Sequence, residues 1–140
     1  MKPSIKLIVW LSGIAFVLSA TSSVLWLLGV NNLFTGHIYT PIQFILIVCI
    51  YQLTLKSISS KWFIALNILF VTFSILNTVY LQPLSIHNSY ARTISSIILV
   101  GLSILYFQQA LQNPTNHQAE KIPMFWFNSG VLLYFFCTLF

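Results

Sequence analysis

The feature that most constrains this chain is its lack of charge: six basic side chains and one acidic side chain stand among 140 residues. A soluble domain carries charge on about a quarter of its residues, which keeps its surface compatible with water. With 5 % charged and 58 % hydrophobic residues, this chain cannot cover a folded surface in that way. Lipid is therefore the expected solvent, and the chain is predicted to be an integral membrane protein.

Five apolar stretches, separated by short polar or helix-breaking sequences, are candidates for membrane crossings. An α-helix needs about 20 predominantly apolar residues to cross the hydrocarbon core of a bilayer. Thr40-Pro41 suits the first turn of the second helix, where the missing N–H of proline costs nothing. The fold class predicted is all-α, a polytopic membrane helical bundle that forms a single transmembrane domain over residues 1–140. Its about five transmembrane helices are expected at 5–30, 38–55, 61–81, 89–111 and 123–140.

The basic residues are distributed unevenly between the predicted loops. The loops at 31–37 and 82–90 contain no lysine or arginine, and Arg92 lies just inside the fourth segment. Cytoplasmic loops carry an excess of Lys and Arg, so the N-terminus is predicted to be cytoplasmic and the location to be the cell inner membrane. Five lysines fall at segment ends on that side, namely Lys2, Lys6, Lys56, Lys61 and Lys121.

Polar residues inside the segments gather on single helix faces, where they can join helices by hydrogen bonds or line a cavity. In the third segment these are Asn67, Ser74 and Thr78, with Asn77 beside them. The first segment has a face of small residues, which favours close packing. That face consists of Ser12, Ala15, Ser19, Ser22 and Ser23. In the fourth segment, about a third of the helix circumference holds Arg92, Ser95, Ser96, Ser103 and Tyr106.

Arg92 is the only basic residue on the predicted outer side. Its guanidinium stays charged at physiological pH, and a charge within a membrane segment usually faces the bundle interior or water. With its neighbours it could bind an anion or a polar small molecule by charge-assisted hydrogen bonds. The alternatives are a network that tethers loops, or an Arg92 that snorkels to the interface. The expected rim consists of Arg92, His37, Tyr39, Gln43, Asn88 and Tyr90, beside His87.

This rim has no carboxylate. The only acid is Glu120, which the topology places on the cytoplasmic side. Arg92 therefore lacks a counter-ion on its own side, and an anionic lipid head group or a small anionic ligand is the partner that this absence suggests.

Sequence signals for catalysis are weak. One acid excludes acid–base work by paired carboxylates, and the topology divides His37, His87 and His117 between two sides, which leaves too few ligands for a zinc site. Cys49 and Cys137 lie in apolar stretches and are interpreted as small hydrophobic residues. The chain is predicted not to be an enzyme, with no catalytic, metal or cofactor-binding residue. No basic run is present, so nucleic acid is not an expected partner.

Short motifs span much of the chain in order: NNLFTGHIYTPIQF over 31–44, NSYAR over 88–92, LYF over 105–107 and PMFWFNSG over 123–130. They resemble an uncharacterised family of bacterial multi-pass inner-membrane proteins. The family has no assigned activity, so the resemblance implies topology alone. Its members have a helix before Lys2 and further helices after the fifth segment, which implies that this chain is a shortened member or a fragment. The resemblance also implies an acid where Gln43 stands.

The leading hypothesis is a non-enzymatic sensing or assembly module whose outer rim meets a ligand, a lipid or a partner protein. The alternative is a subunit of a small-solute transporter or channel. Expected partners are membrane lipid, a homo-oligomer or membrane-protein partner, and a small anionic ligand. The transport alternative predicts an aqueous path along Asn67, Ser74, Ser96 and Ser103.

Overall fold

A computed structural model describes residues 3–112 and 122–139, and every regular element in that part of the chain is helical. The prediction of an all-α bundle is confirmed. In chain order the elements are α1 (Pro3–Leu27), α2 (Phe34–Thr54), α3 (Ser60–Leu76), the π-helical η1 (Asn77–Leu81), α4 (Ser89–Gln112) and α5 (Pro123–Cys137).

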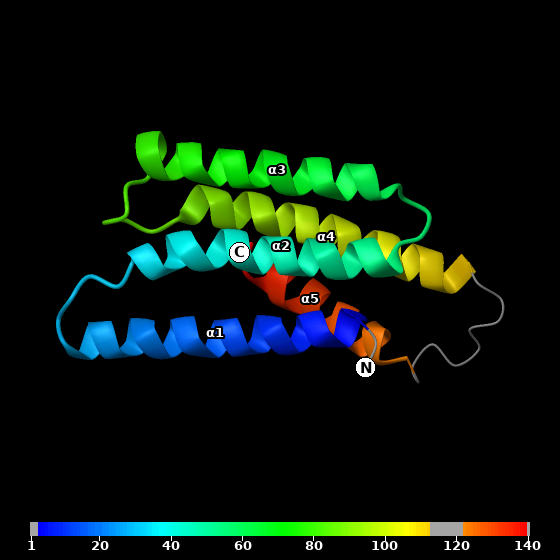
Figure 1. Ribbon diagram of the computed structural model, residues 1–140, viewed down its shortest axis with the longest axis horizontal. Coiled ribbons are helices and arrows are strands. Elements are labelled where there is room, and N and C mark those ends of the chain that lie inside the picture. Colours follow the sequence, from blue (N-terminus) through cyan, green and yellow to red (C-terminus); the bar gives the residue numbers. More distant parts are fainter. Residues whose placement is uncertain (1–2, 113–121, 140) are drawn as a thin grey trace.

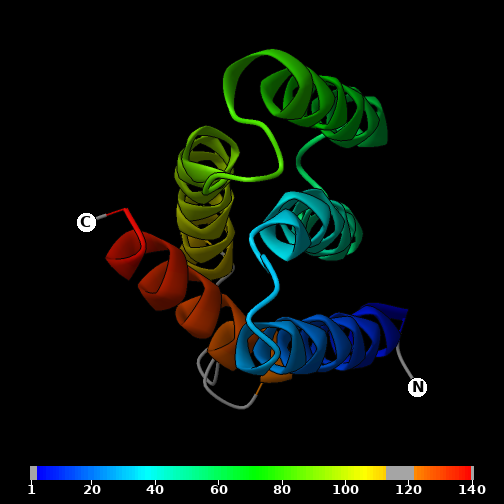
Figure 2. The same cartoon turned by 90° about the vertical axis from the view of Figure 1, so that its left-hand side faces the viewer.

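The first four helices run along one long axis with alternating direction, and α5 crosses this axis obliquely (Figure 1). Helix α2 is central, with α1 on one side and α3 and α4 on the other, while α5 packs against α4 (Figure 2). Helices α1, α2 and α4, and α3 together with η1, are long and apolar enough to cross a membrane. The 15 residues of α5 rise only about 22 Å at about 1.5 Å per residue.

Helix α1 ends earlier than the predicted residue 30 because Gly29 turns the chain. Gly29 has φ of 69°, a left-handed conformation that glycine adopts without steric cost. Its N–H donates to the carbonyl of Trp26 at 3.0 Å, and the N–H of Val30 donates to the carbonyl of Leu25 at 2.9 Å. These two bonds form a Schellman motif, which satisfies carbonyls at the end of a helix.

Helix α2 begins at Phe34, so the prediction that Thr40-Pro41 lies in its first turn is wrong. Pro41 stands inside the helix and cannot donate to the carbonyl of His37, four residues earlier. The helix continues through this point because the preceding turn is held by packing: Thr35, His37 and Thr40 are all buried. Residues 34–37 were predicted to be loop, yet they form the first turn of α2.

The core forms where α2, α3, α4 and α5 meet. The rings of Phe44 and Phe70 stack with centroids 3.9 Å apart, which joins α2 to α3. Around them lie the other buried apolar side chains, among them Ile47, Val48, Phe63, Leu99, Leu102, Val131 and Phe135. This core holds the first half of α2 against the start of α4, where the polar cavity described below is found.

The core also contains a polar network that joins three helices. The Tyr51 hydroxyl of α2 donates to Asn128 Oδ1 of α5 at 2.6 Å. Asn128 Nδ2 donates to the carbonyl of Ser103 in α4 at 3.2 Å, and the Ser103 hydroxyl donates to the carbonyl of Asn128 at 3.3 Å. All three residues are 0 % exposed. The network satisfies each of these buried polar side chains inside the protein.

The outer surface of the bundle is apolar. No residue of α1 is buried, and large side chains point outward, as Phe16 at 75 % and Trp62 at 72 % exposure illustrate. In the first helix the hydroxyls of Ser12 and Ser23 donate to carbonyls of their own helix. A surface of this kind suits lipid, because water would be in contact with extended apolar area on every helix.

The Tyr51–Asn128–Ser103 network generates a stability prediction. Tyr51→Phe removes the donor of Asn128 Oδ1 and leaves a buried acceptor unsatisfied, which costs about 1–2 kcal/mol. Unfolding of the purified protein in detergent should therefore occur at lower temperature. Tyr80→Phe is the matched control, since Tyr80 is 76 % exposed. Equal stability of the two variants would contradict a bonding role for the Tyr51 hydroxyl.

Candidate functional site

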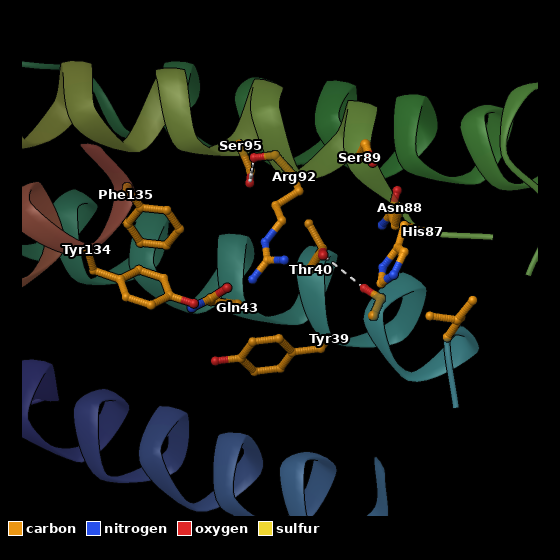
Figure 3. Close-up of a pocket in the computed structure, with 12 residues that line it drawn as sticks. Tyr39, Thr40, Gln43, His87, Asn88, Ser89, Arg92, Ser95, Tyr134 and Phe135 are labelled. Carbon is orange, nitrogen blue, oxygen red and sulfur yellow. Dashed lines mark hydrogen bonds between the residues drawn. The ribbon is translucent and has the colours of Figure 1, made fainter. Parts of the chain in front are cut away.

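A polar cavity of ≈ 360 Å³ lies between the first half of α2, the start of α4 and the end of α5 (Figure 3). Three helices supply its walls, so its shape depends on how they pack. Its polar side chains are Tyr39, Thr40 and Gln43 from α2, His87, Asn88, Ser89, Arg92 and Ser95 at the start of α4, and Tyr134 from α5.

The cavity reaches well into the bundle. Along α2 its lining runs from Leu33, immediately before the helix, to Gln43. The ten steps from Leu33 to Gln43 correspond to about 15 Å at about 1.5 Å per residue. Since α2 spans Phe34–Thr54, Gln43 stands close to its midpoint. The polar residues therefore form more than the shallow rim that the sequence predicted.

Arg92 projects from α4 toward α2, into this cavity (Figure 3). Its backbone carbonyl accepts hydrogen bonds from the hydroxyls of Ser95 at 2.8 Å and Ser96 at 2.9 Å. Within residues 3–112 and 122–139 its guanidinium makes no hydrogen bond and no ion pair. The only acid of the sequence, Glu120, lies outside the described residues. The cavity thus presents a fixed positive charge that no described side chain neutralises.

The structure brings four of the six predicted rim residues together, since Tyr39, Gln43 and Asn88 line the cavity with Arg92. Tyr90 does not join them and is 56 % exposed. The reason is the helix period: two residues correspond to about 200° of rotation, so Tyr90 and Arg92 point to opposite sides of α4. The sequence prediction placed Tyr90 in the rim because it is near Arg92 in the chain, and it did not take this rotation into account.

His37 also lies away from the cavity, on the side of α2 that faces η1. Its Nδ1 is 2.9 Å from the Thr78 hydroxyl and its Nε2 is 3.0 Å from the carbonyl of Ile86. A carbonyl can only accept, so Nε2 carries the proton and donates it. His37 is 5 % exposed and fastens α2 to the segment that leads into α4. This is the loop-tethering role that the sequence left as an alternative.

A chain of amide side chains joins η1 to the start of α4, and one of them, Asn88, lines the cavity. Asn77 Nδ2 donates to Gln82 Oε1 at 3.2 Å and to Asn88 Oδ1 at 2.9 Å. Gln82 Oε1 also accepts the backbone N–H of Tyr90 at 3.0 Å. Asn77 is 0 % exposed, and both partners are buried. The expectation that Asn77 joins helices by hydrogen bonds is consistent with this contact to the beginning of α4.

Several cavity residues were missed by sequence reasoning. Thr40 was interpreted only as part of a helix start, and Tyr134 lies in an apolar helix without periodicity that marks it. The oblique course of α5 brings Tyr134 to the cavity (Figure 3), and no pattern within the sequence of α5 indicates that angle. Gln82, which follows η1 directly and lies outside the cavity lining, was missed as well, because its burial is visible only in the structure.

The chemistry of the cavity is that of a hydrogen-bond donor site. Guanidinium, amide and hydroxyl groups line it, and no carboxylate occurs among the described residues. In the same part of the chain, no three His, Cys, Asp or Glu side chains come close enough to hold a metal ion. Such a lining can bind an anionic or strongly polar group, with Arg92 as the permanent charge.

Comparison of the chain with models of protein families, with curated proteins and with solved structures found no match. The resemblance drawn from the motifs at 31–44, 88–92 and 123–130 stays a prediction. What this protein does is therefore inferred from the chemistry of its own cavity.

Proposed function

We propose that this chain is a multi-pass protein of the bacterial inner membrane and acts as a non-enzymatic sensing or assembly module through the Arg92 cavity. The observation that supports this most strongly is the guanidinium of Arg92, which lies in the cavity without an acidic partner among the described residues. A charged side chain at membrane depth is costly and usually marks a functional site. A ligand, a lipid or a partner protein that occupies the cavity would offset this cost.

The distribution of lysines supports an orientation for this module. Lys6 lies near the start of α1, and Lys56 and Lys61 flank the turn between α2 and α3, at the end of the bundle opposite the cavity (Figure 1). Positive residues favour the cytoplasmic side. With the N-terminus in the cytoplasm, the cavity opens toward the outside of the cell, where an external ligand or partner can reach it.

The position of the cavity suits a sensing or assembly role. Gln43, Arg92 and Tyr134 come from three different helices, so an occupant that contacts all three favours one packing of α2, α4 and α5 over others. A ligand shifts a conformational equilibrium in proportion to its preference for one state. A ligand that binds in the cavity can in this way change the packing of the helices, and with it the surface that a partner protein contacts.

The transport alternative needs water to pass Ser96 and Ser103, and their contacts favour the binding module instead. The Ser96 hydroxyl donates to the carbonyl of Arg92 at 2.9 Å and lies 3.3 Å from the Thr138 hydroxyl. The Ser103 hydroxyl is bonded to Asn128. Both serines are 0 % exposed, so their hydroxyl groups serve contacts between helices.

Cysteine labelling tests the proposed orientation. With Cys49 and Cys137 replaced by alanine, His87→Cys should react with a membrane-impermeant maleimide in intact cells, because His87 is an exposed residue of the cavity lining. Ser59→Cys, in the exposed turn before α3, should react only after the cells are opened. The reverse pattern would place the cavity on the cytoplasmic side and overturn this orientation.

Cysteine substitutions at two serines of α4 distinguish the binding module from the transporter. Ser89 is an exposed residue of the cavity lining, and Ser103 lies about four turns deeper, in a contact with α5. In the background without native cysteines, a water-soluble thiosulfonate should modify Ser89→Cys and leave Ser103→Cys unmodified. Rapid modification of both positions would indicate a continuous aqueous path and would favour the transporter.

A further inference from the structure

We propose that the Arg92 cavity is a binding site for a phosphate group, carried by a lipid head group or by free inorganic phosphate. This inference rests on the proposed function and names the chemistry of the occupant. A guanidinium presents a planar fork of N–H donors that matches the oxygens of phosphate, and it keeps its charge at every physiological pH. In the described part of the chain, no carboxylate competes with a phosphate group for the N–H donors of the Arg92 guanidinium.

A second, independent observation at the same cavity is the amide of Asn88. This side chain is 7 % exposed and lines the cavity, and its Nδ2 is buried without an acceptor among the described residues. Figure 3 shows the nitrogen of this amide on the side of the cavity. Most buried donors in proteins have a partner, so an unpaired one that faces a cavity indicates a missing acceptor.

The orientation of the Asn88 amide is fixed by its neighbours. The backbone N–H of Tyr90 can only donate, so the Gln82 atom that receives it is the oxygen Oε1. Gln82 Oε1 must in turn receive Asn77 Nδ2, and the same Nδ2 then requires the oxygen of Asn88. Rotating the Asn88 amide would place two N–H groups against each other. Asn88 Nδ2 is therefore the atom left for an external acceptor.

The two donors come from neighbouring positions in the chain. Asn88 immediately precedes α4, Arg92 lies in the first turn of that helix, and both side chains line the cavity. The positive end of the α4 dipole also favours an anion there. The backbone N–H groups of Ser89 and Arg92 already donate to His87 and Asn88 carbonyls, so the side chains are the donors that remain.

The size of the cavity fits a small group. Its ≈ 360 Å³ lies near the lower limit of ligand pockets, which run from roughly 300 to 1,000 Å³. Arg92 and Asn88 approach from α4, Gln43 and Tyr39 from α2, and Tyr134 from α5 (Figure 3). Donors from three directions suit a tetrahedral oxyanion, whose oxygens point several ways, better than a flat carboxylate.

Thermal unfolding of the full chain tests this inference. The protein is purified in a phosphate-free sugar detergent and titrated with inorganic phosphate against chloride at equal ionic strength, and separately with short-chain phosphatidylglycerol against diacylglycerol. An occupant that binds only the folded state raises its melting temperature. A rise with inorganic phosphate assigns the site to the free ion, and a rise with phosphatidylglycerol alone assigns it to the lipid head group.

Two cavity variants and one control decide whether Arg92 and Asn88 hold the group. Arg92→Gln removes the charge. Asn88→Asp keeps the oxygen that accepts from Asn77 but replaces the free donor by a carboxylate, and we expect the affinity of each variant to fall by about tenfold or more. Tyr90→Phe, on the opposite side of α4, should respond as the wild type does. If Arg92→Gln does not fold, Asn88→Asp decides the question.

Two results would overturn the inference. One is a wild type that neither phosphate nor phosphatidylglycerol stabilises beyond the chloride and diacylglycerol controls. The other is a stabilisation that both cavity variants retain in full. These failures differ from a failure of the proposed orientation, which cysteine labelling of His87→Cys reports separately and which leaves binding in detergent unchanged.

Discussion

Helices this apolar suit a membrane, and in lipid a polar group must find its partner inside the protein. Tyr51, Ser103 and Asn128 satisfy one another in the core, and His37 bonds on both ring nitrogens. Among the described residues, three buried side-chain atoms have no hydrogen-bond partner, namely Asn67 Oδ1, Asn77 Oδ1 and Asn88 Nδ2. Of these residues Asn88 alone lines the cavity, together with Arg92. Both point into one cavity, and neither finds a partner within the described part of the chain.

The oblique course of α5 contributes to the cavity, because it brings the end of this helix into the lining. Helix α5 packs on α4 and crosses the bundle axis obliquely (Figure 1). Tyr134 and Phe135, near its end, lie beside Arg92 on the wall opposite α2.

The helical architecture followed from the sequence because the apolar stretches and the breakers between them are strong signals. The exact helix ends and the position of Pro41 were predicted only in part from the sequence. Gly29 ended α1 by a turn whose conformation glycine alone favours, and Pro41 was accommodated within α2 by the packing around it. Arg92, Tyr39, Gln43 and Asn88 line one cavity, because the first half of α2 and the start of α4 lie at the same end of the bundle.

What sequence reasoning could not supply is rotation and crossing angle. Helix rotation separates His37 from Tyr39, and Tyr90 from Arg92, although each pair is two residues apart. The tether of His37 to Ile86 depends on the path of the loop before α4. Tyr134 reaches the cavity through the tilt of α5. Each of these depends on contacts between segments distant in sequence.

We propose that a polar, water-accessible space extends to the middle of this bundle while lipid surrounds its apolar outer surface. The most direct test is the collision rate of a spin label with polar and apolar relaxing agents in bilayers. A label at Gln43→Cys should collide mainly with a water-soluble nickel chelate. A label at Ile94→Cys, on the face of α4 opposite Arg92, should collide mainly with dissolved oxygen. The same preference for oxygen at both positions would contradict the claim.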